Sequence, residues 1–172
     1  QKAPVLAIEG LTLAAGSVPL AMDVSLTIQA GEMVGLVGES GCGKSITALA
    51  IMRLLPPQTI SIRRGSILFC GTDVTKSTPD EIRALRGNAI GMIFQEPMTA
   101  LNPLMRVGDQ ILEVLRVHGA PGGAARVQEL LAAVNLPDPA TLARAYPFRL
   151  SGGQRQRVMI AMALALEPRL LI

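Results

Sequence analysis

Alternating apolar and polar residues dominate the first part of the chain. Residues 5–8 and 11–13 are typical of strands, and residues 24–28 alternate as a half-buried strand does. A turn at 31–32 leads into 33–37, a continuous apolar run of the kind expected for a strand that is buried on both faces. We therefore predict an antiparallel β layer that precedes a parallel α/β core.

The next stretch changes repeatedly between helix and strand signals. A helix is predicted over 46–55, because the following proline pair must end it. Glycines bound a strand-like run at 65–71, and residues 78–81 carry the signals of a short helix start. The apolar run 89–94 is predicted to be the next strand, and Gln95 follows at its end.

From about residue 97 the apolar residues recur at the three- and four-residue intervals of helices. Two helix faces are predicted, one from Val107, Ile111, Val114, Leu115 and His118, and one from Val127, Leu130, Leu131 and Val134. The chain is thus predicted to be α/β in three parts. Residues 1–96 hold the β layer and the core, 97–150 form an all-helical insertion, and 151–172 form a further helix and the start of a strand.

One glycine-rich stretch has the residue order of a phosphate-binding loop. It consists of Gly38, Glu39, Ser40, Gly41, Cys42, Gly43, Lys44 and Ser45. The glycines let successive N–H groups point at phosphate oxygens, with the positive end of the following helix behind them. The Lys44 ammonium is expected to reach the β- and γ-phosphates, and the Ser45 hydroxyl to bind the Mg²⁺ that bridges them. The stretch therefore predicts a P-loop NTPase core.

A second glycine pattern follows the helical part of the chain. Leu150, Ser151, Gly152, Gly153 and Gln154 precede a run of apolar residues. Ser151 is predicted to cap a helix whose first residues carry no side chains, which makes a second helix start suited to an anion. One chain rarely needs two such sites for one nucleotide, so we expect this site to complete a pocket on another copy.

Composition and charge exclude several other classes of protein. The 172 residues carry sixteen Lys and Arg against thirteen Asp and Glu, but the bases are scattered and not interleaved with aromatic residues. No nucleic-acid partner is expected from this pattern. The apolar run 158–166 is too short to span a bilayer, and residues 1–4 do not lead into a signal-peptide core. Cys42 and Cys70 form neither a disulfide framework nor a zinc set.

The motifs, in this order and at this spacing, resemble those of the ATP-binding subunit of ABC transporters. Residues 38–45 resemble its Walker A loop, Gln95 its Q-loop, and 150–154 its LSGGQ signature. Within the family, the string IGMIFQEPMTALNP at 90–103 resembles the branch that imports dipeptides, oligopeptides and nickel. The resemblance covers essentially the whole chain and implies the fold of an ABC nucleotide-binding domain that is incomplete at its C-terminus.

The resemblance implies a subunit that binds ATP and Mg²⁺ and hydrolyses ATP. Two subunits, identical or different, are expected to pair head to tail. Each nucleotide would lie between the Walker A loop of one subunit and the signature residues of the other, supplied in trans. Those residues are Ser151, Gly152, Gly153 and Gln154. Lys44 and Gln95 are the expected catalytic residues, and Ser45 and Gln95 are the expected contacts to Mg²⁺.

The resemblance also implies partners and a location. Hydrolysis would energise an importer for peptides or a related small solute such as nickel, through transmembrane permease subunits and, indirectly, a solute-binding protein. The chain is accordingly expected to be peripheral at the cytoplasmic face of the plasma membrane. Gln95 is expected to relay the state of the nucleotide to the permease.

Two departures from the family pattern modify these expectations. No aromatic residue precedes Phe69, although the family usually stacks one on adenine, and the corresponding neighbourhood here is 13–16. Residues 167–172 resemble the approach to the Walker B strand, but the sequence stops before the acidic residues, the D-loop and the switch histidine. We therefore expect this chain to bind ATP and to hydrolyse it poorly by itself.

Other classes of function share these motifs. A soluble ABC-type ATPase of DNA repair or chromosome maintenance is the main alternative. Such proteins typically carry a coiled coil or zinc modules between the two motifs, whereas only a compact helical insertion separates Lys44 from Ser151. A further alternative is a nucleotide sensor or simple binding module without catalysis.

Overall fold

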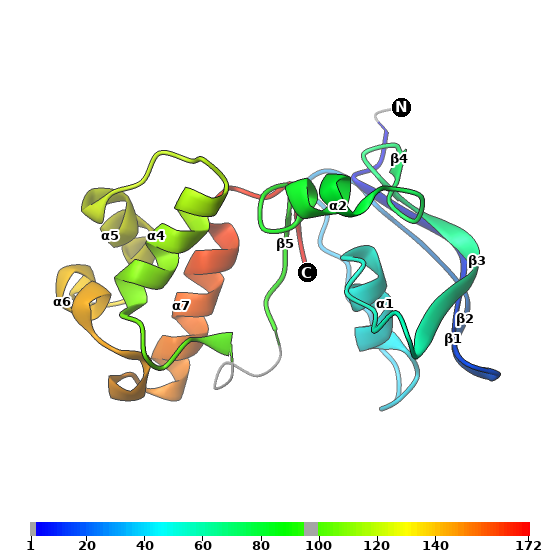
Figure 1. Cartoon of the computed structure of the whole chain (residues 1–172), viewed down its shortest axis with the longest axis horizontal. Coiled ribbons are helices and arrows are strands. Elements are labelled where there is room, and N and C mark those ends of the chain that lie inside the picture. The colour runs from blue at the N-terminus through cyan, green and yellow to red at the C-terminus, as the bar shows by residue number, and fades with distance from the viewer. Residues whose placement is uncertain (1–2, 95–99) are drawn as a thin grey trace. The chain divides into compact units, whose positions relative to one another are not determined.

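The computed structural model describes residues 3–94 and 100–172 and divides into two compact units. Unit 1 is Gln1–Arg83 and unit 2 is Ala84–Ile172 (Figure 1). The predicted division into 1–96, 97–150 and 151–172 follows the motifs rather than compactness, and it stays a prediction.

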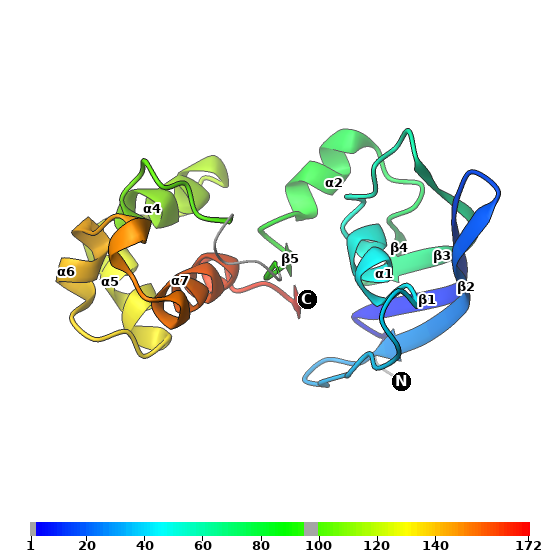
Figure 2. The same cartoon turned by 90° about the horizontal axis from the view of Figure 1, so that it is seen from below.

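Unit 1 contains an antiparallel sheet with the strand order β2-β1-β3-β4. Its strands are β1 (Leu6–Ala15), β2 (Val18–Ile28), β3 (Ile60–Phe69) and β4 (Thr72–Asp73). The three long strands run side by side in both views (Figures 1 and 2). The predicted antiparallel layer is confirmed, although β3 begins at Ile60 rather than at 65.

The core of unit 1 is built mainly by β1. Its side chains Leu6, Ile8, Leu11 and Leu13 are each at most 1% exposed. Helix α1 (Lys44–Ile51) lies over one face of the sheet and buries residues of its own (Figure 2). Burial of each large apolar side chain contributes roughly 1.5–3 kcal/mol to the stability of the fold. The sheet is therefore a stable support for α1.

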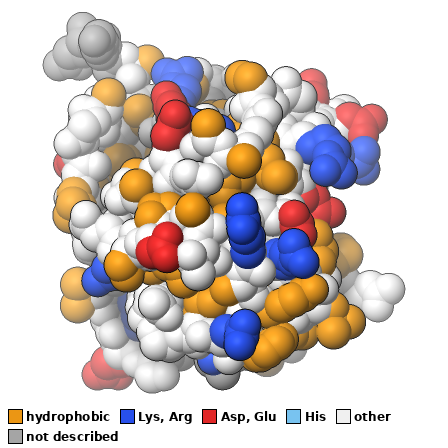
Figure 3. All heavy atoms as spheres, turned by 90° about the vertical axis from the view of Figure 1, so that its left-hand side faces the viewer, with side chains coloured by type: hydrophobic (Ala, Val, Ile, Leu, Met, Phe, Trp, Pro, Cys, Tyr) orange, Lys and Arg blue, Asp and Glu red, His pale blue; other side chains and the backbone are white. Residues whose placement is uncertain are grey.

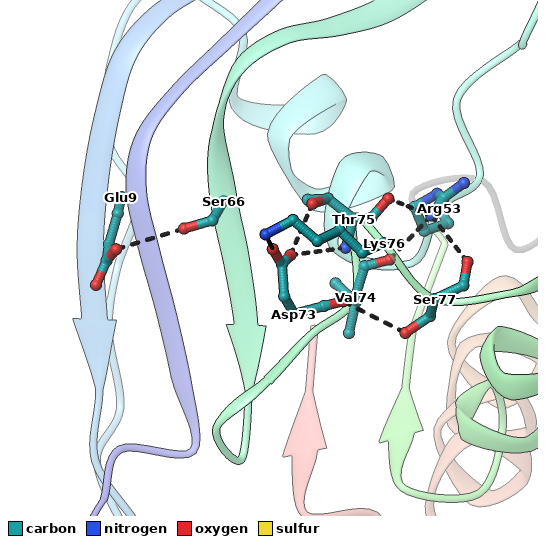
Figure 4. Close-up of polar contacts among 8 residues, drawn as sticks. All are labelled: Glu9, Arg53, Ser66, Asp73, Val74, Thr75, Lys76 and Ser77. Atoms are coloured by element: carbon teal, nitrogen blue, oxygen red, sulfur yellow. Dashed lines mark hydrogen bonds and ion pairs between the residues drawn. The ribbon is translucent and has the colours of Figure 1, made fainter.

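Strands β1 and β3 approach each other closely at Gly65, whose φ is 91°. A Cβ atom at Gly65 would lie 2.5 Å from the carbonyl oxygen of Glu9 and 2.6 Å from that of Gly10. Just beside this point the Ser66 hydroxyl donates to the Glu9 carboxylate across the strands (Figure 4). Glycine is therefore required at position 65, because the φ angle is positive and because no space is left for a Cβ atom.

Helix α1 is shorter than the predicted helix at 46–55, because Arg53 ends it. Arg53 has a φ of 51°, in the left-handed region, so the helix cannot continue through it. Its Nη1 donates to the carbonyl oxygens of Val74 and Thr75, both at 2.9 Å (Figure 4). This long-range contact stabilises the turn, and a local sequence pattern does not reveal it.

The predicted buried strand at 33–37 is wrong for the described chain. These residues form no strand, and the side chains of Met33 and Val37 are 97% and 91% exposed. A strand needs a neighbour that exchanges backbone hydrogen bonds with it. No described strand pairs with 33–37, so the apolar sequence alone does not produce burial there.

Helix α2 (Pro79–Leu85) begins as the sequence predicted. The backbone N–H of Thr78 donates to the Glu81 carboxylate at 2.7 Å, and the N–H of Glu81 donates to the Thr78 hydroxyl at 3.3 Å. These reciprocal bonds satisfy donors at the helix start, as in a capping box. The predicted short helix is therefore confirmed.

Unit 2 is a group of helices around one apolar core. They are α4 (Val107–Val117), α5 (Ala124–Ala133), α6 (Pro139–Arg144), the 3₁₀ helix η1 (Pro147–Arg149) and α7 (Gly152–Leu164). The core includes Val107, Ile111 and Leu115 of α4, Val127, Leu130 and Leu131 of α5, and Val158 of α7. Val114 and Val134 are partly buried against it, and His118 is the C-cap of α4. Both predicted helix faces are thereby confirmed.

A short parallel pair of strands also belongs to unit 2. β5 (Ile90–Gly91) pairs with β6 (Leu170–Leu171), and the N–H of Ile93 donates to the carbonyl of Ile172 at 2.8 Å. The predicted strand at 89–94 is therefore present in its first part, and it runs parallel to β6 as an α/β core requires.

The surface of unit 2 mixes charges of both signs. Figure 3 shows its helical face, on which basic and acidic side chains are interspersed with hydrophobic ones. The Arg126 guanidinium contacts Glu129 at 3.3 Å and Glu167 at 3.2 Å. Among the described residues of either unit, no helix combines the length and apolar character needed to cross a membrane.

Candidate functional site

The phosphate loop lies in unit 1 immediately before α1. Gly41 and Gly43 have φ angles of 83° and 97°, a conformation that other residues rarely adopt. A Cβ atom at Gly43 would lie 2.7 Å from the carbonyl oxygen of Leu20 and 2.9 Å from the Cβ of Ala21. The start of α1 thus packs directly on β2, which fixes the loop on the antiparallel sheet.

The first turn of α1 leaves its backbone donors available. Gly43 is the N-cap and offers no side-chain acceptor, and the first turn contains no acidic residue. The first helical bonds run from the N–H and hydroxyl of Thr47 to the Gly43 carbonyl, at 2.9 and 2.8 Å. The N–H groups of Gly41 and Gly43 have no acceptor among the described residues. Several donors and the positive helix end therefore face one exposed loop.

The Lys44 side chain folds back over this loop. Its Nζ donates to the carbonyl oxygens of Gly38 and Glu39 at 2.8 and 2.6 Å, and lies 3.4 Å from the Cys42 sulfur. The ammonium is thus held above the loop, within reach of any anion that the loop amides bind. Ser45, in the first turn, is exposed.

The predicted loop residues are brought together as one site. Glu39, Ser40, Gly41 and Cys42 are all exposed, so the loop is open to a ligand. Its backbone donors, the Lys44 ammonium and a first helical turn without acidic residues match the triphosphate chain of a nucleotide. For Mg²⁺ the fit is sparser, because no group of three His, Cys, Asp or Glu residues in the described chain forms a metal site. The Ser45 hydroxyl is suited to a cation that keeps most of its waters.

The second motif forms the start of α7 in unit 2. The Gln154 N–H donates to the Ser151 hydroxyl at 3.2 Å, and the Ser151 N–H donates to the Gln154 side-chain oxygen at 2.9 Å. This is a complete capping box, as the prediction of a Ser151 cap required. Gly152 and Gly153 are exposed, so their backbone faces solvent.

Gln95 lies outside the described residues, and its predicted roles stay predictions. Residues 102–105 are held by Gln110, a residue that the sequence did not single out. Gln110 is only 4% exposed; its side-chain oxygen accepts from the Asn102 N–H, and its Nε2 donates to the carbonyls of Asn102 and Met105, each at 3.0 Å. The sequence did contain a signal for this burial. Gln110 lies three residues after Val107, on the buried face of α4.

The exposed glycine loop, the Lys44 ammonium and the start of α1 are together the features of a P-loop nucleotide-binding protein. A family comparison is more specific: the model of the ABC transporter family matches residues 21–172. The chain belongs to the ABC transporter family.

The relatives and solved structures agree with this assignment. The chain is 48% identical over 176 residues to the probable D,D-dipeptide transport ATP-binding protein DdpD of Escherichia coli K12, covering 98% of this chain and 54% of that protein. It is 45% identical over 175 residues to the dipeptide transport ATP-binding protein DppD of Bacillus subtilis 168, covering 98% and 52%. The dimeric post-hydrolysis state of the ATP-binding cassette MJ0796, bound to ADP and Pi, matches with a TM-score of 0.82 and 29% identity, over 96% of this chain and 72% of that one. The chain therefore spans about half the length of these curated relatives.

Proposed function

We propose that the chain is the ATP-binding part of the subunit that powers an importer of peptides or a related small solute such as nickel. The observation that carries the proposal is the Lys44 ammonium held over an exposed glycine loop at the start of α1. The names of the relatives, which include dipeptide transport ATP-binding proteins, supply the solute class. These names favour transport over an ATPase of DNA repair or chromosome maintenance.

Each residue of the loop has a definite role in this proposal. The amides of residues 38–43 and of the first turn of α1 bind phosphate oxygens, and Lys44 exchanges the loop carbonyls for the β- and γ-phosphates. Such charge-assisted bonds offset the charge that develops in phosphoryl transfer. Ser45 together with Gln95 would hold Mg²⁺, which would supply further positive charge against the phosphates.

A second subunit completes the proposed site. Ser151 and the backbone of Gly152, Gly153 and Gln154 contact the γ-phosphate bound to the partner, in a head-to-tail dimer. A nucleotide that binds only the closed dimer shifts the population toward closure, and permease subunits couple that closure to transport. The proposed location is the cytoplasmic face of the plasma membrane, with a solute-binding protein as an indirect partner.

Catalysis by the isolated chain is proposed to be slow. The resemblance to the family places the acidic residues that catalysis requires after the strand approached by residues 167–172. Binding is therefore the property to measure first.

Titration of the chain with a non-hydrolysable ATP analogue and Mg²⁺, followed by calorimetry, tests the proposal. Lys44→Ala should weaken binding by at least about tenfold, because a charge-assisted hydrogen bond is lost. Lys76→Ala is the matched control: it removes the same charge from an exposed lysine of unit 1 that contacts Asp73 instead. Equal affinities of Lys44→Ala and Lys76→Ala would refute the proposed role of the loop.

A further inference from the structure

Unit 1 contains a cavity that the proposed nucleotide site does not use. It has a volume of about 550 Å³ and lies between the turn after α1, the first half of β3 and the segment after β4. Its lining consists of Arg53, Leu55, Pro57, Ile60, Ile62, Arg63, Arg64, Gly65 and Thr75. No residue of the phosphate loop contributes to it, and the volume is in the range of small-molecule sites.

The lining combines positive charge with apolar surface. Three of its residues are arginines and none is acidic. The Arg53 Nη1 donates to the carbonyls of Val74 and Thr75 (Figure 4). Arg63 Nη2 donates to the Gly16 carbonyl at 2.8 Å. A carbonyl has no formal charge, so the bond to Gly16 positions the Arg63 guanidinium without neutralising it.

The backbone beside the cavity is also open. β4 pairs with β3 at Leu68 and Phe69, so the first half of β3 has β1 on one side and the cavity on the other. Ile60 and Ile62 are partly buried there, and Gly65 adds no side chain at the far end. A ligand can therefore place an apolar part against the isoleucines while its charged group reaches the arginines.

We propose that this cavity binds an amphipathic organic anion, with a phosphate or carboxylate group on an apolar body. Arginine forks match the geometry of both groups, which explains the cluster better than general surface charge does. The anion can come from a free metabolite or from the headgroup of an anionic lipid. The site is independent of the nucleotide site, because the two share no residue.

Octyl phosphate, used as a monomeric probe in calorimetry on the whole chain, tests the site. We expect saturable binding that Arg64→Ala weakens about tenfold, through the loss of a charge-assisted bond. Ile62→Ser should weaken octyl phosphate binding and leave inorganic phosphate binding unchanged. Arg83→Ala is the matched control, because it removes an exposed arginine of unit 1 that contacts Asp80 at 3.3 Å.

Further arms separate this site from the phosphate loop and identify the source of the anion. Octyl phosphate binding should persist in Lys44→Ala; loss there with no change in Arg64→Ala would assign the probe to the loop and overturn the proposal. Equal weakening by Arg83→Ala and Arg64→Ala would also overturn it. Co-sedimentation with vesicles of phosphatidylcholine and phosphatidylglycerol, abolished by Arg64→Ala, would identify a lipid headgroup. Octyl phosphate binding without vesicle binding would identify a free metabolite, and binding of neither probe would refute the site.

Discussion

The phosphate loop of unit 1 and the start of α7 in unit 2 are both glycine-rich helix starts. They differ in whether a side chain accepts hydrogen bonds from the first backbone N–H groups. At α1 the N-cap is Gly43, no side chain caps the helix, and Lys44 brings a positive charge. At α7 Ser151 and Gln154 cap each other, and the Arg155 Nε donates to the Leu150 carbonyl at 3.0 Å. We propose that the first helix start holds an anion by itself. The second is already stabilised, and is suited to adding contacts to an anion that another group holds.

The largest expected difference between the two helix starts concerns their glycines. Gly43→Ala should destabilise the chain by roughly 2–4 kcal/mol, because alanine is strained at this φ and its Cβ meets the Leu20 carbonyl. Gly153→Ala should change stability by less than about 1 kcal/mol and in the stabilising direction, because no atom lies within 4 Å of a Cβ there. Urea unfolding measures both. A Gly153→Ala variant as unstable as Gly43→Ala would show that the two starts are equally constrained.

A smaller effect separates the two serines. Ser151→Ala removes the acceptor for the Gln154 N–H and should cost about 1 kcal/mol of unfolding free energy. Ser45→Ala removes an exposed hydroxyl that caps nothing, so stability should change by less than about 0.5 kcal/mol. Its effect should instead be on Mg²⁺-dependent nucleotide binding, measured by calorimetry. If Ser45→Ala were the more destabilising of the two, the contrast between the helix starts would be wrong.

The smallest expected effect lies away from both helix starts, at Asp73 of unit 1. Burial acts most strongly and raises its pKa, but hydrogen bonds from Thr75 and Lys76 together outweigh it and bring the pKa below the ordinary value (Figure 4). Because the folded pKa is depressed, this stabilisation is present above about pH 4 and is lost as the pH falls through the folded value. The loss should be well under about 1 kcal/mol, since Lys76 is exposed.

Thermal unfolding between pH 7 and pH 3 measures that loss. Asp73→Asn should flatten the pH dependence, whereas Asp80→Asn, at an exposed position of α2, should leave it unchanged. An identical acid profile for Asp73→Asn and the parent chain would contradict the assignment.

Local patterns were sufficient for elements whose partners lie close in the sequence. The paired strands β1 and β2, the apolar faces of α4 and α5, and the Ser151 cap follow from spacing and residue type. The glycines and Lys44 of the predicted phosphate loop are close in the sequence, so they lie together without a long-range contact, and their binding of phosphate stays a prediction.

Features that depend on distant residues were not predictable in this way. The apolar run 33–37 looks like a buried strand, but burial needs a paired strand that the described residues do not provide. The early end of α1 depends on Arg53 reaching carbonyls more than twenty positions away. The role of Gln110 depends on a loop that folds back onto α4.

The contacts of Lys44 have a consequence for ligand entry. An ammonium group has three hydrogens to donate, and here it already meets three acceptors of the loop. A small anion that offers one oxygen would break more bonds than it forms. A polyphosphate presents several oxygens at once, so it can replace the hydrogen bonds that Lys44 gives up. Nucleotide binding is therefore expected to favour polyphosphates over anions that offer a single oxygen.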